Sequence, residues 1–221
     1  MANYAVDPEI LRPFVPSKTE LDFWSGTCYV SLVGFMFVNT RVLGIKIPFH
    51  TNFEEVNLRF YVRHMKEGEW RRGVVFIKEI VPRHVLTFVA NTIYKEHYET
   101  MPMDHQWDAM DNSLNVQYRW KKKEWSVLTV ETEKQPVKID DGSEEEFMTE
   151  HYWGYTKIGK HTSEYGVEHP RWQVYPTKSY QVDVDFATVY GPSFSFLSNM
   201  APKSVFLAEG SEVRVLGGTR I

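Results

Sequence analysis

Alternating apolar and polar positions along the chain predict a protein built mainly from β-strands. The clearest alternation runs through residues 53–65, where Val56, Leu58, Phe60 and Val62 fall on one face. The other face carries Glu55, Asn57, Arg59, Tyr61 and Arg63. Successive side chains of a strand point to opposite faces. Residues 53–65 are therefore predicted to form a strand with one apolar and one polar face.

Other segments of strand-like composition are separated by turn residues and prolines. They are residues 20–23, 27–38, 70–80, 115–121, 125–132, 155–166, 171–184 and 204–216. Residues 115–132 are predicted to form a hairpin. Gly73 lies inside one of these segments and indicates a possible bulge.

Helical signals are fewer. Asp7 before Pro8 predicts a short capped helix, and Ser143 with Glu146 forms a capping box. Asp185 predicts another short helix, and residues from Pro82 to about Tyr94 or His97 show helical spacing. The strands do not alternate regularly with helices. The fold class expected is mainly β (α+β), with an antiparallel sheet or barrel and a few short helices.

The composition narrows the possible partners. The chain has 221 residues, 43% of them apolar, and shows no repeat or linker, so residues 1–221 are expected to form a single domain. The net charge of -4 argues against nucleic-acid binding, which needs a basic surface. Neither a secretory signal nor a charge-free stretch of membrane-spanning length is present, so we expect a cytoplasmic location and no membrane partner.

The chain lacks the motifs of cofactor and metal enzymes that can be recognised locally. It contains no phosphate-binding loop, no dinucleotide-binding glycine pattern, no paired-histidine zinc motif and no nucleophile elbow. Cys28 is the only cysteine, which rules out a disulfide within the chain and a cysteine-based zinc cluster. We therefore expect neither a metal nor a cofactor.

Six segments, in this order and spacing, resemble a known family. They are residues 8–16 (PEILRPFVP), 53–62 (FEEVNLRFYV), 90–98 (ANTIYKEHY), 101–103 (MPM), 151–155 (HYWGY) and 204–211 (SVFLAEGS). Together they resemble the YqjF-like family, a group with a domain of unknown function in the acetoacetate-decarboxylase-like superfamily. The resemblance implies a β-barrel around a small-molecule pocket. Family members usually carry a strand before the segment that begins this chain, so a natural N-terminal strand is expected ahead of Met1.

The resemblance also points to site residues. The decarboxylase uses a lysine that forms a Schiff base, a second lysine that lowers its pKa, and a glutamate in an aromatic-x-Glu pattern. Glu55, in Phe53-Glu54-Glu55, matches the glutamate. The lysine pair is absent, because Tyr98 falls nearest the Schiff-base position and Lys95 lies one helical turn away. The absence of the lysine pair argues against decarboxylase chemistry. It does not affect the expected fold, because fold and reaction are separable.

Glu55, Asn57 and Arg59 form the first part of the predicted ligand-binding site. They could line the barrel interior, where Arg59 would grip a carboxylate, or they could be the solvent face of a half-buried strand. Tyr94, Glu96 and Tyr98 complete the predicted site. Lys95 is the candidate nucleophile, but its acidic neighbours would raise its pKa and so favour the unreactive charged form.

Two residues outside this set have alternative interpretations. His151 is interpreted as a hydrogen-bonded structural histidine or as an acid or base in the pocket, and Trp153 as core or pocket wall. The function predicted is a small-molecule-binding barrel protein, with an organic acid or carbonyl compound as ligand and a homo-oligomer possible. The alternatives are a lyase acting on keto acids through Lys95 and a non-catalytic interaction protein with a filled barrel.

Overall fold

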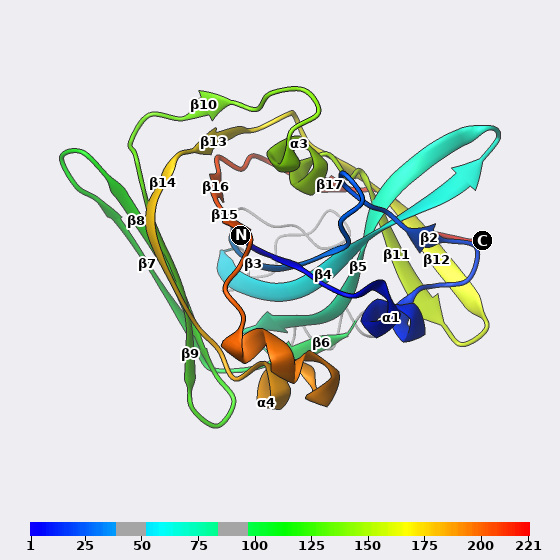
Figure 1. Ribbon diagram of the computed structural model, residues 1–221, viewed down its shortest axis with the longest axis horizontal. Helices are drawn as coiled ribbons and strands as arrows, with labels where there is room; N and C mark the ends of the chain where they lie inside the picture. Colours follow the sequence, from blue (N-terminus) through cyan, green and yellow to red (C-terminus); the bar gives the residue numbers. More distant parts are fainter. Residues whose placement is uncertain (39–51, 84–96) are drawn as a thin grey trace.

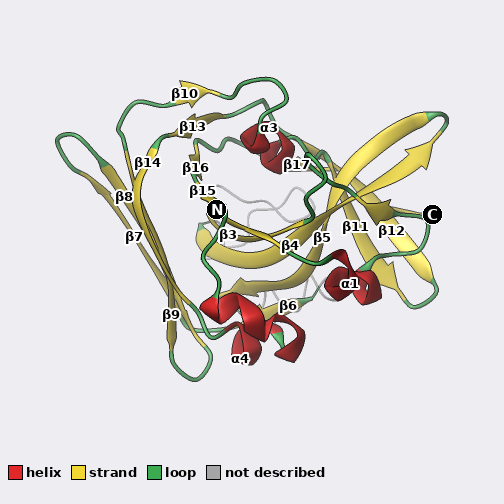
Figure 2. Ribbon diagram, in the orientation of Figure 1, coloured by secondary structure: helices red, strands yellow, loops and turns green. Residues whose placement is uncertain are grey.

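The computed structural model describes residues 1–38, 52–83 and 97–221. The helix predicted to start at Pro82 lies almost wholly outside these residues, as do Tyr94, Lys95 and Glu96. Strands dominate the described part of the chain, as predicted (Figure 2). No helix within these ranges is long and apolar enough to cross a membrane.

The largest sheet has eleven strands, mostly antiparallel, and runs in the order β15-β1-β3-β4-β5-β11-β12-β17. Off this path, β2 pairs with β4, β6 with β5 and β18 with β12. Its strands are β1 (Ala2–Ala5), β2 (Glu20–Leu21), β3 (Tyr29–Phe37), β4 (Phe53–Lys66), β5 (Glu69–Val81), β6 (Tyr98–Thr100), β11 (Trp153–Ile158), β12 (His161–Glu168), β15 (Ser204–Val205), β17 (Arg214–Val215) and β18 (Thr219–Arg220).

Two smaller sheets complete the β-structure. One has the order β14-β9-β8-β7 and the other β10-β13-β16. Their strands are β7 (Met103–Ala109), β8 (Leu114–Lys121), β9 (Trp125–Thr132), β10 (Val137–Lys138), β13 (Gln173–Tyr175), β14 (Thr177–Asp183) and β16 (Leu207–Ala208). Among the described strands no sheet closes on itself, so the structure does not confirm a closed barrel.

Short helices lie on both sides of the large sheet. They are α1 (Pro8–Leu11), α3 (Glu144–Thr149), α4 (Phe186–Tyr190) and the 3-10 helices η1 (Arg12–Phe14) and η3 (Pro192–Asn199). In Figure 1, α3 lies on one side of β3 and β4, and α1 and α4 lie on the other. The three predicted caps are confirmed, with Asp7, Ser143 and Asp185 each accepting a backbone N–H of the first helical turn.

The main core lies on the α1 and α4 side of β4. It contains Val56, Leu58, Phe60 and Val62, together with residues of α4, η3 and β8. A second apolar cluster lies on the α3 side, with Tyr61 of β4 packed against Phe147 and Met148 of α3. Both faces of β4 are therefore covered.

Several local predictions need correction. Residues 155–166 were expected to form one strand, but β11 and β12 form a hairpin across Gly159, whose φ of +59° suits glycine. Pro176 divides the strand predicted at 171–184, because a proline cannot donate to a strand ladder. The last predicted strand, 204–216, is three short pieces.

Gly73 is not a bulge. It pairs with Val62 in regular register and with Trp153 of the parallel neighbour β11. A Cβ atom at Gly73 would lie 2.5 Å from the carbonyl oxygen of Trp153, so the glycine permits a close approach of the two strands. The bulge of β5 is at Ile77, where the register shifts opposite Leu58 and Arg59.

Candidate functional site

The candidate site lies on the face of β4 that turns toward α3. Glu55, Asn57 and Arg59 occupy this face. Asn57 and Arg59 pair with both β3 and β5, and Glu55 pairs with Phe35 of β3. Glu55 and Asn57 are each 1% exposed, and Arg59 is half-buried. A solvent-facing strip is therefore the wrong interpretation for Glu55 and Asn57.

One end of the strip is a buried acidic cluster. Asn57 Nδ2 donates to Glu55 Oε1 at 3.0 Å, and the Tyr98 hydroxyl donates to Glu55 Oε2 at 3.0 Å. Glu79 of β5 is 3% exposed and lies between Asn57 of β4 and Tyr98 of β6 in the strand register. Two carboxylates, an amide and a phenol thus meet across three adjacent strands.

Sequence analysis missed Glu79, because the bulge at Ile77 changes which residues of β5 face α3. Val74 and Phe76 pack on the α3 side, and strict alternation from them would turn Glu79 to the opposite face. The extra residue at Ile77 reverses the alternation, so Ile80 joins the main core and Glu79 joins the acidic cluster. A lone bulge of this kind leaves no signal in the residue pattern.

Tyr98 serves as a donor in this cluster. Burial, together with the charges of Glu55 and Glu79, holds the pKa of Tyr98 well above its ordinary value. The phenol therefore keeps its proton over the physiological pH range. Of the residues predicted around positions 94–98, Tyr98 is the one that lies within the described part, and its hydroxyl contacts Glu55.

Arg59 forms the opposite, cationic end of the strip. Its Nη2 donates to the carbonyl oxygen of Met148 at 3.0 Å, near the C-terminus of α3, and its guanidinium lies 5.7 Å from the centre of the Tyr61 ring. Within residues 1–38, 52–83 and 97–221, no carboxylate forms an ion pair with Arg59, and its buried Nε has no hydrogen-bond partner. Asn57 Oδ1 is likewise buried and unpaired there.

A chain of buried hydrogen bonds fixes the Tyr61 ring under Arg59. Ser31 Oγ donates to Asn3 Oδ1 at 2.7 Å, so the bond of 2.8 Å between Ser31 and Tyr61 is donated by the Tyr61 hydroxyl. Asn3 Nδ2 in turn donates to Ser204 Oγ at 3.0 Å. The surface that Arg59 rests on is thus rigidly held.

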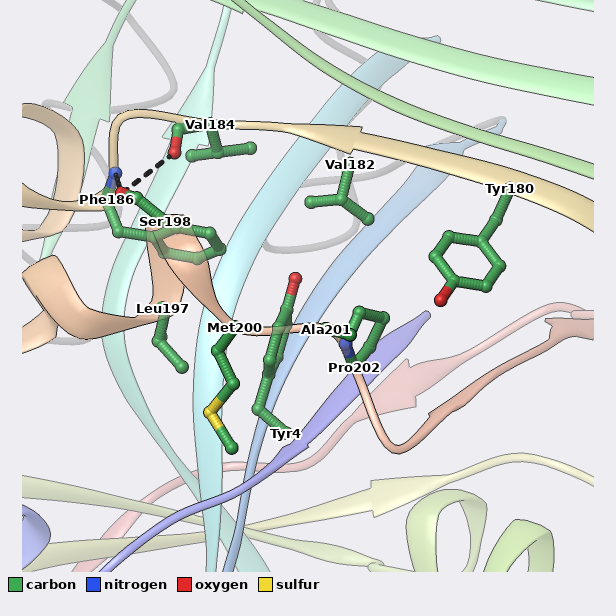
Figure 3. A pocket seen from close by; sticks show the side chains of 10 residues that line it. All are labelled: Tyr4, Tyr180, Val182, Val184, Phe186, Leu197, Ser198, Met200, Ala201 and Pro202. Carbon is green, nitrogen blue, oxygen red and sulfur yellow. Dashed lines mark hydrogen bonds between the residues drawn. The ribbon is translucent and has the colours of Figure 1, made fainter.

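Two hollows in the described part lie away from this strip. A cavity of about 170 Å³ lies between β14, η3 and Tyr4 of β1, and contains none of the predicted site residues (Figure 3). A shallow groove of about 370 Å³ is lined by Trp153 and His169 and includes no residue of β4. Neither hollow is lined by Arg59 or by a residue of the acidic cluster.

Comparison with known proteins identifies the family of this chain. The sequence profile of DUF2071, described as an uncharacterized conserved protein, matches residues 1–212. The chain belongs to the DUF2071 family. It is also 27% identical over 178 residues to the uncharacterized protein YqjF of Bacillus subtilis (strain 168), covering 77% of this chain and 69% of YqjF. The resemblance to the YqjF-like family is therefore confirmed.

Solved structures show the fold of this DUF2071 protein. Acetoacetate decarboxylase from Legionella pneumophila subsp. pneumophila str. Philadelphia 1 superposes with a TM-score of 0.61 at 12% identity, over 100% of this chain and 82% of that chain. The enduracididine biosynthesis enzyme MppR, complexed with pyruvate, superposes with a TM-score of 0.63 at 12% identity, over 99% and 86%. At such identities the likeness establishes an acetoacetate-decarboxylase-like fold and nothing of the reaction.

Proposed function

We propose that this DUF2071 protein binds a small organic acid on the α3-facing side of β4, with Arg59 holding the ligand carboxylate. The observation that carries the proposal is the half-buried guanidinium that has no carboxylate partner in the described residues. An arginine keeps its charge when buried, and leaving that charge without a counter-ion is costly. A carboxylate ligand would supply the missing negative charge in a geometry that suits the guanidinium.

The acidic cluster would limit which groups the ligand can carry at the end away from Arg59. The buried carboxyl groups of Glu55 and Glu79 offer no cation to a second acid group, while Asn57 and Tyr98 belong to the same polar cluster. The ligand would therefore be a mono-acid lying with its carboxylate toward Arg59. MppR, which has a similar fold, was solved in complex with pyruvate, and this supports a small organic acid as the ligand here.

The proposal takes residues 1–221 as one domain and the α3-facing side of β4 as the inside of the barrel expected from the family. An alternative role for Arg59 is purely structural, since its bond to Met148 links β4 to the end of α3. Substituting Arg59 should weaken ligand binding if the arginine holds the ligand, and should leave ligand binding unchanged if its role is structural.

The test compares Arg59→Met with Arg63→Met. Arg63 is a matched control, because it lies on the same strand and the same face but has its own partner, Glu20, at 2.6 Å. Isothermal titration calorimetry with propanoate, pyruvate and lactate should show binding to wild type and to Arg63→Met, and loss of about tenfold or more in affinity for Arg59→Met. Equal affinity of all three proteins for every acid would overturn the proposal.

A further inference from the structure

Asp22 and His151 form a buried pair beside the proposed site. Asp22 follows β2, and its backbone N–H donates to the carbonyl oxygen of Tyr61 on β4 at 3.0 Å. His151 follows α3, and its Nε2 lies 3.3 Å from Asp22 Oδ2. Arg72 of β5 donates to the same oxygen at 2.7 Å. Asp22 is 5% and His151 6% exposed, so both groups are removed from bulk water.

The protonation of this pair follows from its surroundings. Burial alone would raise the pKa of Asp22, but hydrogen bonds from His151 and Arg72 outweigh it and leave the pKa below its ordinary value. Burial, with the positive charges of Arg72 and Arg59, lowers the pKa of His151 to about 4, although Asp22 acts in the opposite direction. At neutral pH, Asp22 is therefore an ionised acceptor and His151 a neutral ring.

This arrangement fixes the tautomer of His151. An ionised carboxylate only accepts hydrogen bonds, so the ring proton of His151 must sit on Nε2, facing Asp22. His151 Nδ1 is then an unprotonated acceptor. It is buried and has no hydrogen-bond partner in the described residues. A buried acceptor without a partner costs free energy unless a ligand or water supplies a donor.

His151 and Arg59 meet around one aromatic ring. The imidazole lies 4.7 Å and the Arg59 guanidinium 5.7 Å from the centre of the Tyr61 ring. Arg59 also bonds the carbonyl oxygen of Met148, three residues before His151. The groups beside this ring include one unpaired donor, Arg59 Nε, and one unpaired acceptor, His151 Nδ1. A complementary ligand must accept at one end and donate at the other.

We infer that the ligand is a hydroxy acid. This inference rests on the function proposed above and narrows its ligand class. The carboxylate accepts from Arg59, and the ligand hydroxyl donates to Nδ1 of His151. The keto acid of the same carbon skeleton has no hydrogen to donate, so it leaves Nδ1 unsatisfied. Leaving such a buried group unpaired weakens binding by about tenfold or more.

The experiment titrates the whole protein with three acids of equal length, 2-hydroxybutyrate, 2-oxobutyrate and butyrate. The hydroxy acid should bind wild type about tenfold more tightly than the other two. His151→Leu should remove this preference while leaving the weaker carboxylate binding. His64→Leu is the matched control, because His64 lies on β4 but is bonded to the exposed carbonyl oxygen of Lys18, and it should keep the preference.

A second readout does not depend on a substitution. The nitrogen NMR signals of His151 in wild type should show a protonated Nε2 and an unprotonated Nδ1, and saturating 2-hydroxybutyrate should shift the Nδ1 signal. Equal affinities for the three acids would overturn the inference while leaving the organic-acid function standing. Binding of 2-hydroxybutyrate with an unmoved Nδ1 signal would overturn it too, and would assign water as the donor. Failure of all three acids to bind would remove the proposed function itself.

Discussion

Tyr98 of β6 donates a hydrogen bond of 3.0 Å to Glu55 of β4, reaching over the intervening strand β5. The bond ties three neighbouring strands together on the face that turns toward α3. It also brings a phenol whose pKa is held well above its ordinary value onto a carboxylate that is 1% exposed. The contact thus contributes both to the stability of this edge of the sheet and to the geometry of the acidic cluster.

Tyr98→Phe should lower the free energy of unfolding by about 1–3 kcal/mol, because it removes a donor from a buried carboxylate. Urea unfolding followed by circular dichroism measures the change. Tyr180→Phe is the control, since Tyr180 is 47% exposed and should change stability by less than about 0.5 kcal/mol. Equal stability of Tyr98→Phe and wild type would show that the bond to Glu55 contributes nothing net.

Gly73→Ala should destabilise the protein strongly. Its added methyl group would lie 2.5 Å from the carbonyl oxygen of Trp153 and 2.6 Å from Cε2 of Tyr155, where β5 and β11 run in parallel. Overpacking of this kind costs about 1–3 kcal/mol, measurable by urea unfolding. Gly217→Ala is the matched control, because no atom lies within 4 Å of the added carbon. If both substitutions gave the same stability, the close approach of β5 and β11 would be wrong.

Local signals predicted much of the fold. Asp7, Ser143 and Asp185 mark helix starts because a capping side chain acts within one turn, and all three cap as expected. The alternation in residues 53–65 predicted β4, which ends one residue later. The strand β7 was missed, since four of its seven residues are exposed and none is buried, so it has no apolar face to mark it; it is extended where it pairs with β8.

The candidate site was predicted in part. Glu55, Asn57 and Arg59 share one face because the period of a strand is two, and that rule needs no tertiary information. Glu79 depends on the bulge at Ile77, and the pairing of Asp22 with His151 joins residues 129 positions apart. The position of Glu79 and the contact between Asp22 and His151 both depend on how the sheet folds, so no periodicity along the chain indicates them.

Schiff-base chemistry should be absent. No adjacent lysine pair occurs around residues 94–98, and Lys95 has Glu96 and Glu99 as close sequence neighbours, which favour its charged form. Incubation with acetoacetate and borohydride, followed by intact mass measurement, should therefore give no covalent adduct. The acetoacetate decarboxylase from Legionella pneumophila subsp. pneumophila str. Philadelphia 1 is the positive control for the trapping reaction. An adduct mapped to Lys95 would revive the lyase alternative.

Stability should fall as the pH drops from about 6.5 to about 4, because His151 stays neutral in the folded protein. Its pKa is about 4 when folded, against 6.5 as the ordinary value, so the unfolded chain binds a proton in this window that the folded chain does not. The penalty is absent above pH 6.5, grows as the pH falls, and is complete below the folded pKa. Its size is on the order of 3 kcal/mol, at 1.36 kcal/mol for each unit of pKa difference.

His151→Gln isolates this effect. The glutamine amide can still donate to Asp22 but does not titrate, so its free energy of unfolding should fall less between pH 7 and pH 4 than that of wild type, by on the order of 3 kcal/mol. Asp22, Arg72 and Arg59 face position 151 in both proteins, and the depressed pKa of Asp22 adds a loss of stability at lower pH in each. Comparing the two proteins at each pH removes that common part. Parallel curves of unfolding free energy against pH would mean that folding does not lower the pKa of His151, so the folded ring would take up its proton near pH 6.5 and Nδ1 would be an acceptor only above that pH.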